Sequence, residues 1–370
     1  MKVQFYVNGS KASAAGERAQ IFAQAVRGAS KEANASVQIF HRPDQKWKGL
    51  ARFVWAGLRT KPDVVYVVDT AYAGVFAAVF LKALLRCAVI VDTGDCTFDL
   101  AQSTGKYTPL QLALIRRTEE TALRGADAVV VRGSYHRDLL LRKGVKRVEF
   151  IPDGVDSSLF SHCESADPSG ANGGGRTRAA YVIGMIGTMS WSSRHQMCYG
   201  WDVVEALSYL RDSPVEAMLV GDGDGRKFLE ERAKQLDVSD RVTFTGLIPK
   251  NDIFSYLKKM DICVSTQSND VVGWVRTTGK LPLYLAASRF VIATDVGEAH
   301  RVLPGVGSLL PYKAVHDLEY PFRLACEVKR LISSPRLLDT ANEGPKVVAS
   351  HFDYAVLAKR AVSLIQELVA

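Results

Sequence analysis

Residues 217–249 read AMLVGDGDGRKFLEERAKQLDVSDRVTFTGLIP. The stretch begins with the apolar run Ala217–Val220, passes through a glycine-rich turn, and continues as the helix-like segment Arg226–Leu236. A second β-branched run, Val242–Phe244, then ends in another glycine, Gly246. An apolar strand, a glycine turn, a helix and a second strand form the repeating unit of a parallel sheet that is covered by helices. The stretch therefore predicts an α/β fold.

The same alternation extends over nearly the whole chain, with one interruption. Residues 161–178 (SHCESADPSGANGGGRTR) are rich in glycine, serine and alanine, contain a proline and lack periodicity, which is typical of a linker. On both sides of it, short apolar runs alternate with helix-like segments. Besides the two strands above, the predicted strands are Val3–Val7, Ser36–Phe40, Val64–Val68, Ala88–Val91, Ala128–Val131, Val148–Ile151, Tyr181–Ile186, Ile262–Ser265 and Val291–Ala293.

This organisation predicts two Rossmann-like domains, each a doubly wound parallel sheet. We expect one domain over residues 1–160, a flexible linker over 161–180 and a second domain over 181–350. We expect the last helix, within 351–370, to cross back and pack on the first domain. Such sheets bind ligands at the carboxyl ends of their strands, so a cleft between the two sets of strand ends is the expected site.

Composition suits this architecture and narrows the partners. With 370 residues the chain is long enough for two domains of ordinary size. It has 47 basic and 39 acidic residues, and this net charge of +8 favours anionic partners such as phosphorylated ligands, nucleic acid or an acidic membrane face. The basic residues are scattered and are not interleaved with aromatic residues, so we expect no nucleic-acid partner.

The sequence also predicts a cytoplasmic protein. Its first residues, MKVQFYVNGS, lack the long apolar core of a signal peptide. The longest apolar run, Ala71–Leu81, is too short to span a bilayer and is expected to form a buried helix. The six cysteines lie far apart and form no Cys-x-x-Cys pair, which favours reduced thiols and argues against a zinc site.

Glycine turns follow several predicted strands in the second half of the chain. Gly187 ends the strand in Ile183–Thr188 (IGMIGT), where a glycine lets a ligand approach the backbone, although a tight turn without a ligand fits equally well. The turn after Val220 lacks the lysine and hydroxyl residue of a phosphate-binding P-loop. Asp222 and Asp224 in this turn have the spacing of a metal-binding pair but lack the glutamate of a calcium loop, so we expect no metal.

Several stretches, taken in order, resemble the motifs of a known family. The motifs of residues 217–249 continue into Met260–Ser265 (MDICVS), and they are accompanied by Arg124–Val131 (RGADAVVV), Ile151–Phe160 (IPDGVDSSLF) and Phe290–Gly297 (FVIATDVG). This succession resembles the retaining glycosyltransferases of family 4, which have the GT-B fold of two facing Rossmann-like domains. The resemblance implies transfer of a sugar from an activated phosphate donor to an acceptor hydroxyl, without a metal or cofactor, in the assembly of cell-surface polysaccharide or glycolipid.

The resemblance further implies that a nucleotide-sugar donor binds to the second domain. Backbone groups after the strand that ends at Gly246 would hold the base. Amides at a helix N-terminus would hold the diphosphate, beside positive charge that stabilises the leaving phosphate. For those cations, a solvated face is the alternative interpretation. The expected donor-site residues are Gly187, Thr188, Arg194, Gly221, Gly246, Leu247, Thr277, Thr278 and Gly279, with Arg276 and Lys280 as catalytic cations.

Three departures from the family pattern put the identity of the donor in question. Leu283 stands where the family has the glutamate that grips the donor ribose, and Val275 stands where it has another glutamate. The basic residues that usually follow Gly187 are displaced, and Arg194, in an apparent insertion at Trp191–Tyr199, is a possible substitute. A polyprenyl-phosphate sugar or phosphoribosyl pyrophosphate therefore remains an alternative donor. A sugar-nucleotide epimerase of the same fold and a two-lobed binding protein are the alternative functions.

The first domain is expected to bind a glycan or lipid-linked acceptor. Residues 91–98 (VDTGDCTF) follow a strand, and a carboxylate there can orient or deprotonate the acceptor hydroxyl. We choose Asp95 over Asp92 for this catalytic role, with capping of the turn as an equal alternative. The other candidates on the acceptor side are Gly9, Gly16, Asp69 and His136.

A basic helix with aromatic residues is the candidate for contact with a membrane. Lys46–Lys61 (KWKGLARFVWAGLRTK) places aromatic and aliphatic residues at helical spacing and basic residues towards both ends. This pattern is typical of a helix on an anionic interface, but we favour a core-packed helix with a solvated basic face over tight membrane binding. We expect weak, salt-sensitive association with the inner face of the cell membrane.

Overall fold

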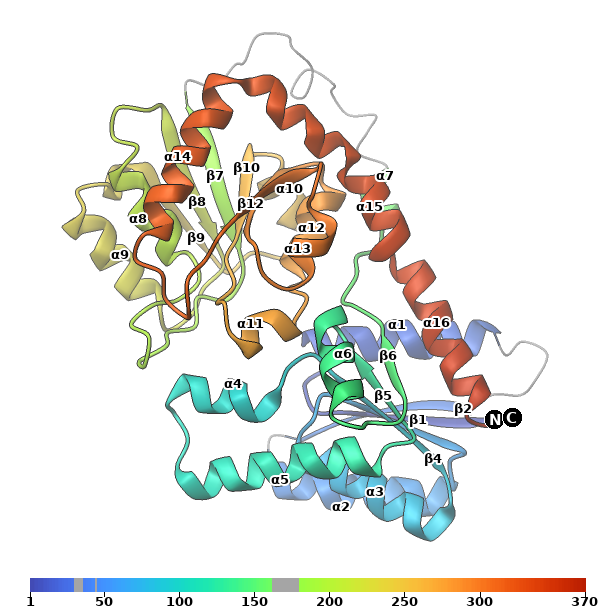
Figure 1. Cartoon of the computed structure of the whole chain (residues 1–370). Helices are drawn as coiled ribbons and strands as arrows, with labels where there is room; N and C mark the ends of the chain where they lie inside the picture. Colours follow the sequence, from blue (N-terminus) through green and yellow to red (C-terminus); the bar gives the residue numbers. More distant parts are fainter. Residues whose placement is uncertain (30–35, 44, 162–179) are drawn as a thin grey trace. The chain divides into compact units, whose positions relative to one another are not determined.

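The computed structural model describes residues 1–29, 36–43, 45–161 and 180–370 (Figure 1). These residues form two units: unit 1 comprises Met1–Asp153 and Tyr354–Ala370, and unit 2 comprises Gly154–Asp353. Most of the predicted linker, 161–180, lies outside the described residues. The chain enters unit 2 earlier than the predicted boundary at residue 160, because Val155 is buried in the core of unit 2 and its N–H donates to the carbonyl of Phe352 at 2.9 Å.

Unit 1 is a six-stranded parallel sheet in the order β2-β1-β3-β4-β5-β6, with helices on both faces (Figure 1). The side chains of neighbouring residues in one strand point to opposite faces of the sheet: Phe5 packs against one set of helices and Tyr6 against the other. The strands are β1 (Lys2–Val7), β2 (Ser36–His41), β3 (Val64–Val68), β4 (Ala88–Thr93), β5 (Ala128–Val131) and β6 (Val148–Phe150). The helices are α1 (Ala14–Ala29), α2 (Lys46–Thr60), α3 (Tyr72–Leu85), α4 (Thr97–Thr104), α5 (Pro109–Gly125), α6 (Ser134–Arg142) and α16 (Tyr354–Glu367).

The C-terminal helix α16 is part of unit 1. Its apolar residues share one core cluster with α1 and with β1, so that α1 and α16 cover the same face of the sheet (Figure 1). The opposite face is covered by α2 and α3, which pack against each other through Phe53 of α2 and Leu81 of α3.

Unit 2 is a second six-stranded parallel sheet, in the order β12-β11-β10-β7-β8-β9. Its strands are β7 (Tyr181–Ile186), β8 (Val215–Val220), β9 (Val242–Gly246), β10 (Ile262–Ser265), β11 (Phe290–Thr294) and β12 (Gly307–Leu310). Its helices are α7 (Ser158–Ser161), α8 (Trp201–Ser208), α9 (Arg226–Gln235), α10 (Ile253–Leu257), α11 (Val271–Val275), α12 (Lys280–Ala286), α13 (Glu298–Val302), α14 (Tyr320–Ser333) and α15 (Gly344–His351), with 3-10 turns η2 (Ser239–Arg241), η3 (Lys250–Asp252) and η4 (Pro335–Glu343). The predicted fold class, two doubly wound parallel sheets, is confirmed.

Each sheet has a point at which the strand order reverses. In unit 2 the chain runs outward from β7 through β8 to β9 and then returns to β10 on the other side of β7. In unit 1 the reversal lies between β1 and β3. The crevice outside the carboxyl ends of the strands at such a point is where doubly wound sheets bind ligands. Gly187 follows β7, and Gly9 and Asp69 follow β1 and β3, so these predicted residues lie at the reversal points.

Candidate functional site

Three glycine turns close the ends of neighbouring strands in unit 2. Gly187, Gly221 and Gly246 follow or end β7, β8 and β9, with φ of 149°, 124° and 71°. The Gly187 N–H donates to the Val220 carbonyl at 2.9 Å, and the Gly221 N–H donates to the Gly246 carbonyl at 3.1 Å. A Cβ on Gly221 would lie 2.2 Å from the carbonyl oxygen of Gly187. Only glycine allows these turns to lie so close together.

The predicted residues beside these turns face solvent. Thr188, directly after Gly187, is exposed. Leu247, directly after Gly246, is 82% exposed. The rim of the strand ends in unit 2 is therefore accessible to a ligand at both predicted positions.

Helix α12 is fixed so that Lys280 lies over Gly187. The hydroxyl of Tyr284 accepts a hydrogen bond from the Ile186 N–H at 2.8 Å, which ties the helix to the end of β7. The Lys280 Nζ lies 3.5 Å from the position that a Cβ on Gly187 would take. The sequence-predicted glycine and lysine are thus brought together at the reversal point of the sheet.

Lys280 lies beside a second cation and an aromatic ring. Its Nζ is 3.4 Å from the centroid of the Tyr199 ring. The Tyr199 hydroxyl accepts a hydrogen bond from Arg276 Nη1 at 3.4 Å. Burial lowers the pKa of Lys280; the Tyr199 phenol group opposes this effect and Arg276 adds to it. Among the residues that the structure describes, the charged partners acting on Lys280 thus include no carboxylate.

A buried glutamine holds the loop before α12 in place. Gln267 is buried, and its Nε2 donates to the carbonyls of Gly273 at 2.8 Å and Arg276 at 3.3 Å. Thr277 is buried, and the buried hydroxyl of Thr278 has no hydrogen-bond partner within the described ranges. Gly279 is exposed, with open space where a side chain would stand. The loop and α12 together present two cations and an unsatisfied hydroxyl, a set of groups that a phosphate would complete.

The two positions where the family has glutamates are apolar and packed. Val275 is fully buried, and Leu283 packs against the core cluster of α12 and β11. Neither side chain can accept a hydrogen bond from a ribose hydroxyl. The structure therefore provides no carboxylate at the position that normally grips the ribose.

Tyr199, rather than Arg194, is the residue of the 191–199 insertion that reaches Lys280. Arg194 is exposed on this segment. Burial lowers the pKa of its neighbour His195, and Arg194 adds to this effect. Tyr199 was not predicted as a site residue, because a single tyrosine in this segment belongs to no motif. The only signal in the sequence was its position two residues before α8.

In unit 1, Asp92 near the end of β4 and Asp95 in the loop after it have different surroundings. Asp92 is completely buried and forms an ion pair with Arg18 at 2.7 Å. Asp95 is only partly buried, and its carbonyl accepts a hydrogen bond from the Thr93 hydroxyl at 2.9 Å. Asp95 therefore has the more accessible carboxylate of the two.

Asp69 is held in a strained backbone conformation at the end of β3. Its φ is 65°, a left-handed value that aspartate tolerates better than most residues. Its carboxylate pairs with Arg132 at 2.7 Å. Burial raises the pKa of Asp69 and outweighs the opposing effect of Arg132. An accessible carboxylate fixed by a buried arginine thus lies at the reversal point of this sheet.

The remaining candidates on the acceptor side are packed. A Cβ on Gly16 would lie 2.3 Å from the Ser10 carbonyl, so this glycine lets the first loop fold onto α1; a Cβ on Gly9 would lie 2.4 Å from the Ser13 hydroxyl. His136 is buried on α6 with its Nε2 3.7 Å from the Cys96 sulfur. Burial lowers the pKa of His136 to about 4, so its imidazole is neutral.

The Asp222 and Asp224 side chains both accept hydrogen bonds from backbone N–H groups. Asp222 accepts the Gly223 N–H at 2.8 Å, and Asp224 accepts the Trp191 N–H at 2.7 Å. The described part of the chain contains no group of three histidine, cysteine, aspartate or glutamate residues suited to a metal ion.

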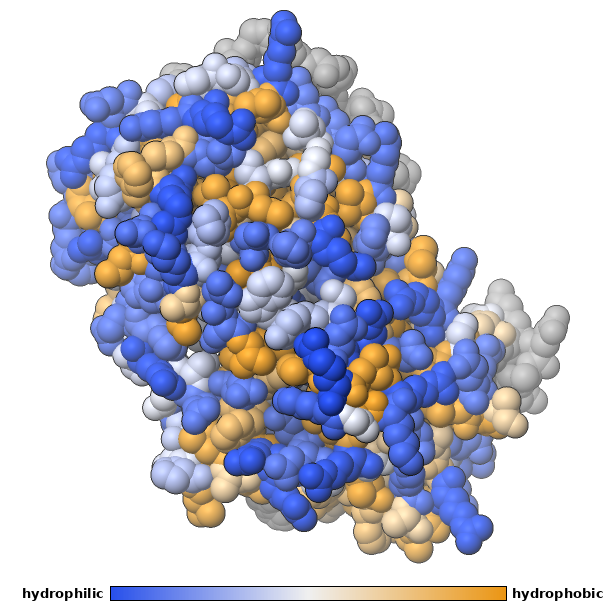
Figure 2. Space-filling model, viewed as in Figure 1, coloured by the Kyte–Doolittle hydropathy of each residue, from blue (hydrophilic) through white to orange (hydrophobic). Residues whose placement is uncertain are grey.

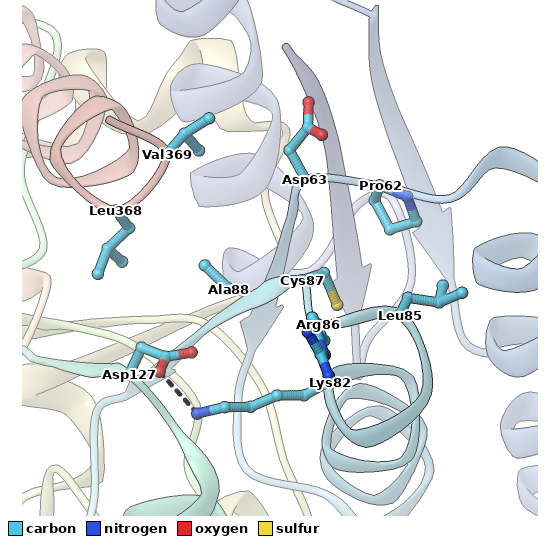
Figure 3. A pocket seen from close by; sticks show the side chains of 10 residues that line it. All are labelled: Pro62, Asp63, Lys82, Leu85, Arg86, Cys87, Ala88, Asp127, Leu368 and Val369. Carbon is cyan, nitrogen blue, oxygen red and sulfur yellow. Dashed lines mark hydrogen bonds and ion pairs between the residues drawn. The ribbon is translucent and has the colours of Figure 1, made fainter.

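In unit 1, a cavity of about 570 Å³ lies at the amino ends of β3 and β4 (Figure 3). Asp69 and Asp95 lie at the opposite edge of this sheet, after the carboxyl ends of the same strands. The Lys82–Asp127 ion pair, 2.7 Å long, lines the cavity. Its walls also include Asp63, Arg86 and Leu368, from the segment before β3, the end of α3 and the C-terminal segment. Doubly wound sheets bind their ligands at the other edge, so this cavity is separate from the candidate site.

Comparison with known proteins places both units in one family. Residues 180–323 match the family model described as glycosyl transferases group 1, and residues 11–154 match the glycosyl transferase 4-like domain. The alpha-monoglucosyldiacylglycerol synthase of Streptococcus pneumoniae is 21% identical over 64% of this chain and 54% of its own length. The 2-deoxystreptamine N-acetyl-D-glucosaminyltransferase of Streptomyces fradiae is 24% identical over 62% of this chain and 56% of its own length. The chain thus spans about half the length of these curated relatives.

A solved structure shows the same fold over the whole chain. The Anabaena protein Alr3699/HepE, in complex with UDP and glucose, superposes with a TM-score of 0.72 at 17% identity, over 99% of this chain and 100% of that one. The order of the sequence motifs, the two doubly wound sheets and both family models all indicate a glycosyltransferase. The chain belongs to the group 1, family 4-like glycosyltransferases with the GT-B fold.

Proposed function

We propose that this protein transfers a glycosyl group from a donor with a phosphate leaving group to an acceptor hydroxyl, with retention of configuration and without a metal. The observation that carries this proposal is the pair of cations at the reversal point of unit 2. Lys280 contacts the ring of Tyr199 and Arg276 contacts its hydroxyl, beside the unsatisfied Thr278 hydroxyl. Within the described chain, no carboxylate neutralises Lys280. Burying a lysine ammonium away from water costs free energy unless a negative charge pairs with it. An anionic ligand would supply that negative charge.

In this proposal the two units have separate tasks. Unit 2 binds the donor, and the fixed charges of Lys280 and Arg276 stabilise the negative charge that develops on the leaving phosphate. Unit 1 binds the acceptor, and the accessible Asp95 carboxylate orients its hydroxyl or takes up its proton. Asp69, fixed by Arg132, offers a second acceptor-binding carboxylate.

A nucleotide sugar is the first donor to test. The relative HepE was crystallised with UDP and glucose, which supports a nucleotide-sugar donor here as well. The apolar side chains of Val275 and Leu283 favour a second candidate, a donor without a nucleoside, such as a polyprenyl-phosphate sugar or phosphoribosyl pyrophosphate. Titration with UDP-glucose, UDP, phosphoribosyl pyrophosphate and inorganic pyrophosphate separates the two. If UDP binds no more tightly than pyrophosphate, the nucleoside contributes nothing and the second donor class is favoured.

Replacing Lys280 with alanine should weaken binding of pyrophosphate and UDP-glucose roughly ten- to a hundredfold. The substitution removes a charge-assisted contact to phosphate worth about 1.5–3 kcal/mol. Isothermal titration calorimetry measures the change, and hydrogen exchange checks that unit 2 keeps its protection. The matched control is Lys259→Ala, which removes an exposed lysine of the same unit. Equal affinities for wild type and Lys280→Ala would refute the phosphate assignment.

We further propose that the acceptor is a glycan or a lipid-linked sugar of the cell surface, reached from the cytoplasmic face of the membrane. One relative is a monoglucosyldiacylglycerol synthase, which supports a lipid acceptor. None of the described helices combines the length and the apolar character needed to cross a bilayer. We propose that contact with the membrane is peripheral.

The surface of α2 and α3 is suited to such contact. The inward face of α2 carries Phe53, whose ring stacks on Tyr6 with centroids 4.6 Å apart. Its outward face exposes Trp55 beside Arg59, with the guanidinium 5.3 Å from the ring centroid. Helix α3, predicted to be buried, is buried on one face only and exposes Phe80 and Leu84 on the other. Hydrophobic and hydrophilic residues mix at the lower end of unit 1 (Figure 2).

Unit 1 should bind anionic vesicles weakly, and salt should weaken this binding. Each basic residue near an anionic surface contributes about 1 kcal/mol, screened over about 8 Å at physiological salt. The double variant Arg52→Glu/Arg59→Glu should therefore lower the partition coefficient at least about tenfold. Sedimentation with phosphatidylglycerol vesicles at low and high salt is the measurement, and Lys234→Glu/Lys329→Glu, on exposed residues of unit 2, is the control. Absent or salt-independent binding would mean that the acceptor comes from solution.

A further inference from the structure

The segment that carries Tyr199, residues 191–199, is firmly anchored to unit 2. The Met189 N–H donates to the Asp222 carbonyl at 3.0 Å, and the Met189 carbonyl accepts the Gly225 N–H at 2.8 Å. The Trp191 ring stacks on Phe228 of α9 with centroids 4.0 Å apart. These contacts fix the beginning of the segment to the turn and helix that follow β8.

The other end of the segment is fixed by a glycine turn and a buried cysteine. Cys198 is buried and lies 3.8 Å from the Gly225 carbonyl. Gly200 has a φ of 96°, a left-handed value that places the chain at the start of α8 with Tyr199 directly before the helix. A Cβ on Gly200 would lie 3.2 Å from both Leu219 and Met185. The segment therefore presents Tyr199 from a rigid position.

Tyr199 contacts both cations of the candidate donor site through different parts of its side chain. Its ring face covers the Lys280 ammonium, with the nitrogen 3.4 Å from the centroid, and its hydroxyl accepts from Arg276. The Tyr199 side chain also packs against the apolar core of unit 2. Leucine or phenylalanine would meet that packing requirement, but only tyrosine supplies both a π face and a hydroxyl acceptor.

We propose that Tyr199 is a positioning residue for the donor's phosphate. Its ring holds Lys280 and its hydroxyl holds Arg276, so that the two mutually repelling cations are placed to meet the same phosphate oxygens. The inference rests on the proposed function, because it presumes that Lys280 and Arg276 bind phosphate.

The test compares Tyr199→Leu, which keeps the apolar packing, with Tyr199→Phe, which keeps the ring. Binding of inorganic pyrophosphate is titrated calorimetrically from pH 7 to pH 11. We expect Tyr199→Leu to bind about three- to thirtyfold more weakly at pH 7, because it loses the cation–π contact. The alkaline pH at which binding is lost should also fall, because the ring no longer stabilises the charged form of Lys280. Tyr199→Phe should restore that alkaline midpoint while binding more weakly than wild type, because it lacks the hydroxyl that Arg276 uses.

Tyr209→Leu, at the other end of α8, is the matched control and should leave both quantities unchanged. If wild type binds neither pyrophosphate nor any sugar nucleotide, the proposed function fails and this inference fails with it. If wild type binds pyrophosphate while Tyr199→Leu matches it in affinity and in alkaline midpoint, Tyr199 serves packing alone and only the inference is overturned. Should Tyr199→Leu not fold, a Tyr199→Phe protein with wild-type affinity would overturn it equally.

Discussion

Replacing Arg18 with methionine is expected to cost unit 1 about 3–5 kcal/mol of its free energy of unfolding. Arg18 is 1% exposed, and its guanidinium donates to the Asp92 carboxylate at 2.7 Å and to the carbonyls of Ile151 and Pro152 at 2.6 and 2.8 Å. Burial acts to lower the pKa of Arg18, but Asp92, Asp153 and Tyr66 together raise it, so the arginine stays charged. Methionine fills similar space but leaves the buried Asp92 charge and two carbonyls without this donor.

Hydrogen exchange with increasing urea measures this loss separately in each unit. Peptides from β4 and β5 should become less protected in Arg18→Met, while peptides from β7 and β8 should not change. Arg27→Met is the control, because Arg27 lies on the same helix but is exposed and makes a single hydrogen bond to the Val37 carbonyl at 3.0 Å. A loss below about 1 kcal/mol, or one shared by unit 2, would show that the pair does not hold unit 1 together.

A double variant separates the buried charge from the lost packing. Adding Asp92→Asn to Arg18→Met removes the carboxylate that has lost Arg18 and keeps Arg132 and the Tyr66 hydroxyl as partners, so the double variant should be more stable than the sum of the single losses predicts. The coupling expected for such a contacting pair is about 0.5–3 kcal/mol. Strict additivity would mean that the two side chains do not interact in the folded protein.

The fold was readable from the sequence because both sheets are buried on both faces. Runs such as Val64–Val68, in which every residue is buried, leave little choice but a central parallel strand. The missed strand, Gly307–Leu310, lies at the edge of its sheet, is only partly buried and has no β-branched residue. No element was predicted between residues 304 and 353, where this strand, α14 and α15 lie.

The glycines and Lys280 belong to local motifs, whereas their partners are distant in the sequence. Tyr199 lies far along the chain from Lys280, and the Arg18–Asp92 pair spans 74 residues. A single sequence carries no signal for such pairs, because only the strand order brings them together. The sequence therefore identified the turns at which a ligand is expected, but not the side chains that hold the charged groups in place.

A buried aspartate in unit 2 should make stability depend on pH. Asp202 lies in the first turn of α8, is 3% exposed, and one of its carboxylate oxygens has no hydrogen-bond partner in the described residues. Burial raises its pKa from 3.8 to about 7; a hydrogen bond with Thr266 opposes the rise, and the nearby Glu205 and Asp317 add to it. The folded protein thus retains a proton on Asp202 that the unfolded chain releases near pH 4.

The sign of the effect follows from that difference in proton binding. Between about pH 4 and pH 7 the folded state binds more protons than the unfolded state, so stability falls as pH rises through this range. Above the folded pKa the full cost of a buried charge is present, at most about 4 kcal/mol. Asp202→Asn cannot ionise and should therefore be more stable than wild type at pH 8, by up to that amount. At pH 4, where wild-type Asp202 is also neutral, the two should differ little.

Urea unfolding of unit 2, followed by hydrogen exchange in β7 and β8 at pH values from 4 to 8, measures this difference directly. The exposed Asp212→Asn on the following turn is the matched control and should shift the unfolding free energy by less than about 0.5 kcal/mol at every pH. The diagnostic quantity is the change in the Asp202→Asn advantage with pH, since a packing effect of the amide would be the same throughout. An advantage of equal size at pH 4 and pH 8 would show that Asp202 does not change its protonation between these values in the folded protein. A rising advantage would show that the first turn of α8, close behind Tyr199, contains a residue whose charge the fold disfavours.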